Sequence, residues 1–118
     1  LYRLQEAHDR GVKVTVYQDE GHYNSQKTNV GTHIEALRAK IKDYFLVKKE
    51  PGILHHKVVI IDDNKVILGS MNFSRSGAGA GNDENFLLIK NAGPIVAAFK
   101  SDISRIAKWA YRAPVYNP

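Results

Sequence analysis

Residues 55–72 have the sequence HHKVVIIDDNKVILGSMN, and the rest of the chain is organised around this stretch. Two apolar runs, 58–61 and 66–68, lie on either side of a short polar segment, which predicts two strands joined by a turn. His55 and Lys57 precede the first run, and the second run leads into Gly-Ser-x-Asn. A charged side chain is costly to bury without a partner, so polar residues at fixed offsets beside apolar strands indicate a functional site.

Strand alternation separates the two neighbouring histidines. Successive side chains of a strand point to opposite faces, so His55 and Lys57 share one face and His56 points to the other. If the two strands pair as a hairpin, residues 69–72 return to the level of His55. The sequence therefore predicts a histidine, a lysine, a serine and an asparagine together at one edge of a sheet.

These side chains suit the chemistry of phosphate diesters. An imidazole is a nucleophile or a general acid and base near neutral pH. A lysine ammonium neutralises the non-bridging phosphate oxygens, and an asparagine amide donates hydrogen bonds to them. Glu84, which follows a glycine-rich loop, is placed to accept a hydrogen bond from the second imidazole nitrogen of His55.

The spacing H-x-K-x4-D-x6-G-S-x-N resembles the motif of the phospholipase D superfamily, the HKD phosphodiesterases. The flanking segments 7–14 and 82–85 and the final helix resemble the same family, so the resemblance covers most of the chain. The motif falls on His55, Lys57, Asp62, Gly69, Ser70 and Asn72 with every spacing kept.

The resemblance implies a mechanism in two in-line displacements. His55 would be the nucleophile that forms a phosphohistidine intermediate, and Lys57 and Asn72 would hold the phosphate. The resemblance implies neither a metal ion nor any other cofactor.

Three further residues receive supporting roles by the same resemblance. Ser70 would support the phosphate or the histidine network, and Glu84 would orient His55. Asp62 would have a structural or histidine-orienting role more than a role in proton transfer.

The chain holds one such motif, whereas the family's active site needs two, one histidine attacking and the other protonating the leaving group. His8, His22 and His33 lack the following lysine and the Gly-Ser-x-Asn segment. A homodimer would complete the site, and a second HKD motif in a longer chain is the other solution. A two-fold dimer brings the same patch together twice, so the dimer is favoured.

The charge balance favours nucleic acid, DNA or RNA, as the substrate. The formal net charge is +5 and the isoelectric point is near 9.5, which favours polyanionic partners. Three alternatives stay open: a phospholipid or cardiolipin hydrolase acting on anionic phospholipid, a non-catalytic nucleic-acid-binding module, and a metal-dependent nuclease. The acids available to the last are Asp62, Asp63, Asp83 and Glu84.

The predicted fold class is α/β, with a mixed β-sheet flanked by helices in a phospholipase D-like arrangement. The predicted element order is α-β-α-β-β-β-β-α, in one domain over residues 1–118 that lacks an N-terminal strand and ends in a tail, 113–118. The predicted helices cover 1–10, 32–44 and 94–111, and the predicted strands cover 12–17, 45–47, 53–61, 65–68 and 85–89.

The composition adds bounds but no compartment. A chain of 118 residues with 43% hydrophobic and 25% charged residues is typical of one globular domain. The absence of cysteine excludes disulfides, thiolate metal sites and a cysteine nucleophile. No signal or transmembrane segment is visible, and the localisation stays unknown.

Overall fold

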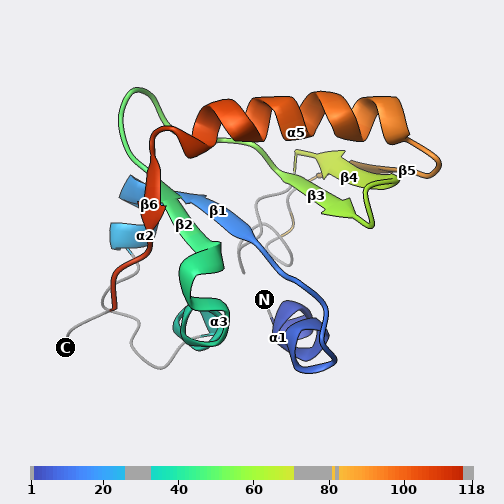
Figure 1. Ribbon diagram of the computed structural model, residues 1–118. Helices are drawn as coiled ribbons and strands as arrows, with labels where there is room; N and C mark the ends of the chain where they lie inside the picture. Colours follow the sequence, from blue (N-terminus) through green and yellow to red (C-terminus); the bar gives the residue numbers. More distant parts are fainter. Residues whose placement is uncertain (1, 26–32, 71–80, 82, 116–118) are drawn as a thin grey trace. The chain divides into compact units, whose positions relative to one another are not determined.

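The computed structural model describes residues 2–25, 33–70, 81 and 83–115 (Figure 1). The chain divides into two compact units, Leu1–Leu54 with Ile106–Pro118, and His55–Arg105. The second unit begins at His55, the first residue of the motif.

The first unit is built on a three-stranded mixed sheet. Strand β2 is central, with β1 parallel to it on one side and β6 antiparallel on the other. The parallel pair needs a crossover, and the chain between β1 and β2 contains helical segments. The elements are α1 (Tyr2–Asp9), β1 (Val16–Asp19), α2 (Glu20–Ser25), α3 (His33–Ile41), η1 (Lys42–Tyr44), β2 (Phe45–Lys48) and β6 (Ala110–Arg112).

The core of the first unit lies around β2. Three of the four β2 residues are buried and the fourth is half-buried, as expected for a central strand covered on both faces. The Tyr23 ring packs at a tilt against Phe45, and its hydroxyl donates to the Pro114 carbonyl. The buried residues of this core are Tyr23, Leu37, Ile41, Phe45, Val47 and Ala113.

The second unit is an antiparallel sheet with one long helix. The strands β3 (Val58–Ile61), β4 (Lys65–Gly69) and β5 (Phe86–Ile89) are paired in that order, and α5 (Gly93–Ala107) follows them and runs past the end of the unit. Among the described residues, no helix has the length and apolar character needed to cross a membrane.

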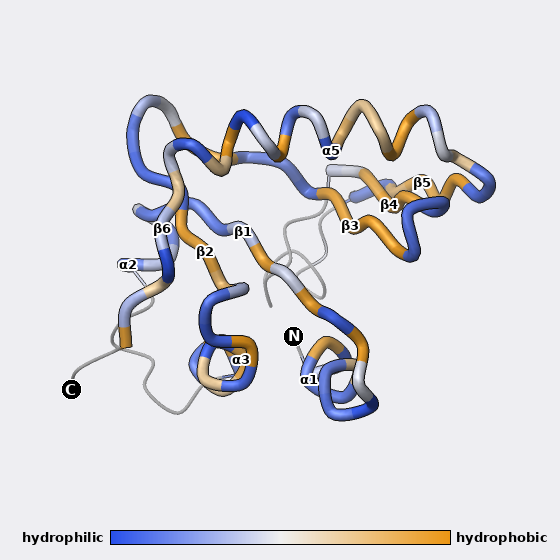
Figure 2. Tube along the Cα trace, viewed as in Figure 1, coloured by the Kyte–Doolittle hydropathy of each residue, from blue (hydrophilic) through white to orange (hydrophobic). Residues whose placement is uncertain are grey.

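The register of the second sheet sets which face is covered. Val58 pairs with Leu68, and Val66 pairs with both Ile60 and Ile89, so these five apolar residues point to one face. The other four pack against Val66, Ala92 and Val96, the buried core of this unit, to which α5 contributes Val96. The trace of β3 and β4 is largely hydrophobic, whereas α5 alternates between hydrophilic and hydrophobic residues (Figure 2).

The edge strand β5 remains exposed. Phe86, Leu87 and Leu88 expose 70%, 56% and 45% of their surface. An exposed apolar run on an edge strand is unusual for a lone soluble sheet, because such edges pair readily with other chains. The second unit therefore has a small core on one face and an uncovered apolar edge.

The predicted α/β class with mixed strand pairing and flanking helices is confirmed, with the strands divided between two small sheets. The predicted helix 32–44 is present as α3 and η1, which divide at Lys42 because its φ of 49° is left-handed. Thr32, the predicted cap of that helix, lies outside the described residues.

The predicted element order is wrong at two places. A short helix, α2, replaces part of the polar loop, because an Asp19 side-chain oxygen accepts a hydrogen bond from the His22 amide at 3.1 Å and caps its first turn. The final helix ends at Ala107 and strand β6 follows, because β2 offers backbone partners there: the Ala113 amide donates to the Phe45 carbonyl at 2.8 Å.

Candidate active site

The segment from His55 to Lys57 precedes β3 instead of belonging to it. The predicted strand 53–61 is formed only over Val58–Ile61, because the β3–β4 pairing ends where Val58 meets Leu68. His55 is exposed, and the Lys57 ammonium folds back to donate to the His55 carbonyl at 2.8 Å. The two proposed phosphate-contacting side chains therefore lie on a segment without strand pairing among the described residues.

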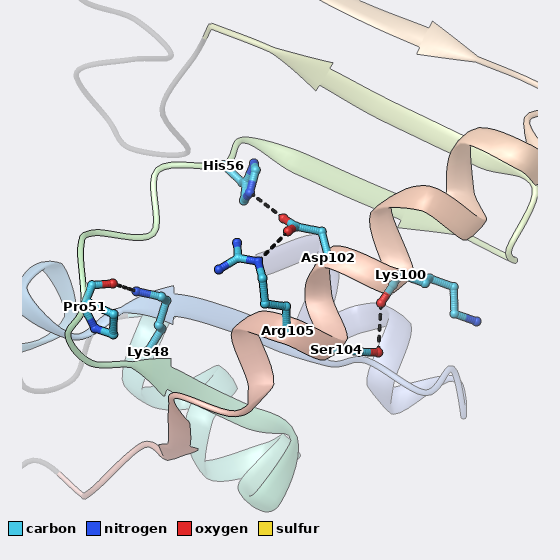
Figure 3. A network of polar contacts seen from close by, with 7 residues as sticks. All are labelled: Lys48, Pro51, His56, Lys100, Asp102, Ser104 and Arg105. Carbon is cyan, nitrogen blue, oxygen red and sulfur yellow. Dashed lines mark hydrogen bonds and ion pairs between the residues drawn. The ribbon is translucent and has the colours of Figure 1, made fainter.

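The two neighbouring histidines have different surroundings. The His56 imidazole Nε2 lies 3.0 Å from Asp102 Oδ2 on α5, and Arg105 Nε donates to Asp102 Oδ1 at 2.9 Å (Figure 3). Arg105 holds the pKa of the Asp102 carboxyl below its usual value; burial opposes this effect, and His56 adds to it to a lesser extent. For the His55 ring, no hydrogen bond to another described residue is found.

Gly69 and Ser70 join β4 to the start of β5. A side chain at Gly69 would place its Cβ 2.3 Å from the Asn85 carbonyl oxygen, so only glycine allows this close approach. The Ser70 amide donates to the same carbonyl at 3.1 Å, and the Ser70 hydroxyl accepts from the Asn85 amide at 3.2 Å. That hydroxyl also donates to Glu84 in a short hydrogen bond.

The structure thus pairs Glu84 with Ser70, two residues far apart in the sequence. Glu84 is predicted to orient His55, but its described partner is the serine hydroxyl. Continuing the β3–β4 register by one residue sets Lys57 opposite Gly69, next to Ser70. The predicted phosphate ligand Asn72 lies outside the described residues, as does Asn82.

Asp62 lies at the other end of the hairpin. Asp62 and Asp63 have φ values of 54° and 56° and form the turn between β3 and β4. Asp62 lies seven positions after His55, which is roughly 20 Å at the usual rise per residue of a strand. This position suits the structural role predicted for Asp62 and is too distant for direct contact with the His55 of the same chain.

Comparison with known proteins places this arrangement in a family. The family described as cardiolipin synthase, PLD-like domain, matches residues 1–107. The chain belongs to this PLD-like domain family.

Relatives and a solved structure agree with this assignment. A phospholipase D of Rickettsia bellii is 36% identical over 105 residues, which cover 89% of this chain and 49% of the relative. A mitochondrial cardiolipin hydrolase of Chlamydomonas reinhardtii is 27% identical over 101 residues, or 86% of this chain and 42% of the relative. The chain therefore spans about half the length of the curated relatives it matches.

The solved structure is that of Nuc from Salmonella typhimurium, a phospholipase D family member. It superposes with a TM-score of 0.70 at 25% identity and covers 92% of this chain and 68% of that one. The likeness extends the family assignment from the sequence to the three-dimensional fold.

The acids available for the metal-dependent alternative do not gather at one place in the PLD-like domain. Asp63 pairs with Lys100 at 3.0 Å on α5, whereas Glu84 pairs with Ser70. Within the described part of the chain, no three histidine, aspartate or glutamate side chains are close enough to share a metal ion.

The segment that leads into His55 is held by two side chains that the sequence analysis did not single out. Lys48 is buried, and its ammonium donates to the carbonyls of Lys49, Pro51 and Gly52 at 3.2, 2.5 and 2.9 Å. The contact with Pro51 is drawn in Figure 3. Asp19, besides capping α2, accepts from the Leu54 amide at 2.9 Å. A capping signal after the first strand points to Asp19, but no sequence pattern predicts the lysine contacts.

Proposed function

We propose that this PLD-like domain is a phosphodiesterase that cleaves nucleic acid through a phosphohistidine on His55. The observation that carries the proposal is the β3–β4 register, which leads the His-x-Lys segment and the Gly-Ser segment to the same end of one hairpin. A nucleophile and the groups that hold the phosphate must lie together in this way for in-line attack.

The first displacement forms a bond between phosphorus and a His55 ring nitrogen and breaks the bond to the leaving oxygen. Lys57 neutralises charge on the non-bridging oxygens, and Asn72 donates a hydrogen bond there. Glu84 accepts the Ser70 hydrogen and thereby fixes the direction of that hydroxyl. In the second displacement water attacks phosphorus, the P–N bond breaks, and the phosphate monoester leaves.

A second histidine is needed in both steps. It gives a proton to the leaving oxygen in the first displacement and removes a proton from water in the second. We propose that the His55 of a second copy supplies it in a homodimer, with a second HKD motif of a longer chain as the other source.

Two observations bear on the substrate. The net charge of +5 supports a polyanion such as DNA or RNA. The similarity to proteins named phospholipase D and mitochondrial cardiolipin hydrolase supports a phospholipid as the second candidate. The exposed apolar residues of β5 are compatible with that second candidate.

One assay separates these hypotheses. The protein is incubated with single-stranded DNA, double-stranded DNA, RNA, cardiolipin vesicles and a chromogenic phosphodiester, all in excess chelator. We expect cleavage of polynucleotide and of the chromogenic diester, loss of at least about a thousandfold in His55→Ala, and no change in His8→Ala, the matched histidine control on α1. Intact mass spectrometry of the quenched reaction should detect a phosphorylated protein that His55→Ala lacks.

Each other outcome contradicts a stated part of the proposal. Loss of all activity in chelator excludes the metal-free mechanism. Hydrolysis of cardiolipin alone makes the phospholipid the substrate. Binding of nucleic acid without cleavage supports the non-catalytic module, and full activity of His55→Ala excludes this site. The mass in solution separates a homodimer from a single chain.

A further inference from the structure

The backbone of residues 55–57 has no strand partner among the described residues. The β3–β4 ladder starts at Val58, one residue beyond Lys57. The internal contact of the segment, from Lys57 Nζ to the His55 carbonyl, ties it to itself and not to the sheet. The orientation of the segment that carries His55 and Lys57 must therefore depend on a contact other than strand pairing.

His56 provides such a contact. Its imidazole Nε2 lies 3.0 Å from Asp102 Oδ2 on α5, and Arg105, one turn further along the same helix, holds the other oxygen at 2.9 Å. Arg105 orients the carboxylate, since each oxygen of Asp102 has its own partner. The contact spans 46 residues of sequence and joins the unpaired segment to the helix that covers the sheet.

We infer that His56 is a positioning residue for the proposed catalytic pair, acting through Asp102 and Arg105 on α5. In extended backbone, residues 55 and 57 project opposite to residue 56. A side chain fastened at position 56 therefore sets the rotation of the backbone that carries His55 and Lys57. The catalytic part of this inference rests on the function proposed above, whereas the mechanical part does not.

The contact between His56 and Asp102 is expected to affect the reaction rate more than the free energy of unfolding. The His56 and Asp102 side chains are 49% and 35% exposed, and ion pairs this exposed add little to stability. The reaction rate is far more sensitive to the placement of the reacting groups, because a displacement of about 1 Å can lower the rate a hundredfold. We therefore expect a catalytic effect much larger than the effect on unfolding.

The charges around His56 favour the pair over a wide range of pH. Asp102 and Arg105 face it from α5, and His55 and Lys57 flank it in the chain. Arg105 helps to hold the pKa of the Asp102 carboxyl below its ordinary value, so the acceptor stays ionised in mild acid. A neutral imidazole can still donate Nε2–H to this carboxylate, so the contact does not depend on one protonation state of His56.

The test is a double-mutant cycle with four variants and a matched control. The variants are His56→Ala, Asp102→Ala, the double variant, and His56→Gln, whose amide can still donate to the carboxylate. The control is Lys100→Ala, which removes another ion pair between α5 and the hairpin, Lys100–Asp63 at 3.0 Å. Two quantities are measured for each: kcat and KM on a chromogenic phosphodiester, and hydrogen–deuterium exchange of the peptide containing residues 54–58.

We expect His56→Ala and Asp102→Ala each to lower kcat by about tenfold to a hundredfold, with KM changed less than about twofold. The double variant should lose no more than either single variant, because the two residues act through one contact. His56→Gln should keep kcat within about threefold of the unmodified protein. Exchange at residues 54–58 should speed up in the two alanine variants and not in Lys100→Ala.

Unchanged exchange in both alanine variants would overturn the inference, as would losses that add in the double variant or a His56→Gln variant as slow as His56→Ala. A protein that cleaves no diester would refute the proposed function alone, because exchange then still decides whether His56 and Asp102 hold the segment.

Discussion

The two units differ in how their cores are covered. In the first, six buried residues among those described form the core, two of them on the central strand β2, and even a lysine is enclosed. In the second, three buried residues lie between one sheet face and α5, while β5 remains open to solvent. The unit with the larger core contains none of the proposed catalytic residues.

The difference shows what holds the candidate site. In the second unit polar contacts fix the positions that matter, Ser70 with Glu84 and His56 with Asp102. Hydrogen bonds at the surface contribute little net stability, yet they direct particular atoms. We therefore expect loss of a polar contact in the second unit to lower activity more than stability, and loss of a buried side chain in the first unit to lower stability; the following substitutions test this division.

The largest expected effect is on the free energy of unfolding, when a phenylalanine is replaced by alanine in the core of the first unit and, for comparison, on the exposed strand of the second. Phe45→Ala should destabilise the protein by about 4 kcal/mol, because it empties a site in the first core where the phenylalanine is 1% exposed. Phe86→Ala, on the exposed β5, should cost less than about 0.5 kcal/mol. Denaturant unfolding of both variants measures the difference.

An equally large cost for Phe86→Ala would contradict the comparison. It would mean that β5 is covered in solution by another chain, and the unfolding midpoint would then depend on protein concentration. A substitution of Tyr44, half exposed beside the first unit's core, is the surface control for Phe45.

The next largest effect is expected for Gly69→Ala, a substitution in the second unit. The new methyl group meets the Asn85 carbonyl and the Phe86 Cα at 2.3 and 2.8 Å, so β4 and β5 must separate. Overpacking of this kind costs about 1–3 kcal/mol. Activity should fall further than stability does, because Ser70 and Glu84 move with the strands; Gly93→Ala, with open space around its Cβ, is the control.

Asp19→Ala should destabilise the first unit by about 1–2 kcal/mol, since it removes the α2 cap and the acceptor for the Leu54 amide. Asp19→Asn keeps one oxygen acceptor and should recover about half of this loss, because its amide nitrogen cannot accept the second hydrogen bond. Thermal unfolding of the two variants measures it. Equal losses in both would show that the charge, and not the hydrogen bonds, is what α2 and Leu54 require.

The smallest expected effect is a shift in one titration. A hydrogen bond to Glu20, with a contribution from burial, raises the pKa of Tyr111 to about 12. Because the folded-state pKa lies above the unfolded value, this contact stabilises the fold below about pH 10 and is lost as the pH rises through about 12. In Glu20→Gln the late-titrating tyrosine should move back towards 10 in an ultraviolet titration; no shift would disprove the contact.

Some of this structure was accessible from sequence patterns. The apolar runs at 58–61 and 66–68 predicted the hairpin correctly, because Val58, Ile60 and Val66 keep the alternation that a half-covered sheet requires. The spacing of the motif was specific enough to indicate the family. Local patterns of this kind predict elements whose partners are close in sequence.

Contacts between distant residues were not predictable in the same way. The contact between Asp19 and the Leu54 amide and the strand added by Ala110–Arg112 depend on partners distant in the sequence. The start of β3 at Val58 depends on where β4 ends, which no residue of the 53–57 segment encodes. The pair of His56 and Asp102 joins residues that only the packing of α5 brings together.

The burial of two cations changes how the overall charge should be judged. Arg38 and Lys48 are 7% and 5% exposed, and the lysine ammonium is already surrounded by backbone carbonyls. Neither side chain is exposed enough to contact a phosphate backbone and displace a counterion from it, so fewer cations are available for binding than the composition suggests. A binding curve measured against salt concentration would count fewer displaced ions than the composition suggests, and attraction to a polyanion would depend on where the remaining lysines and arginines lie.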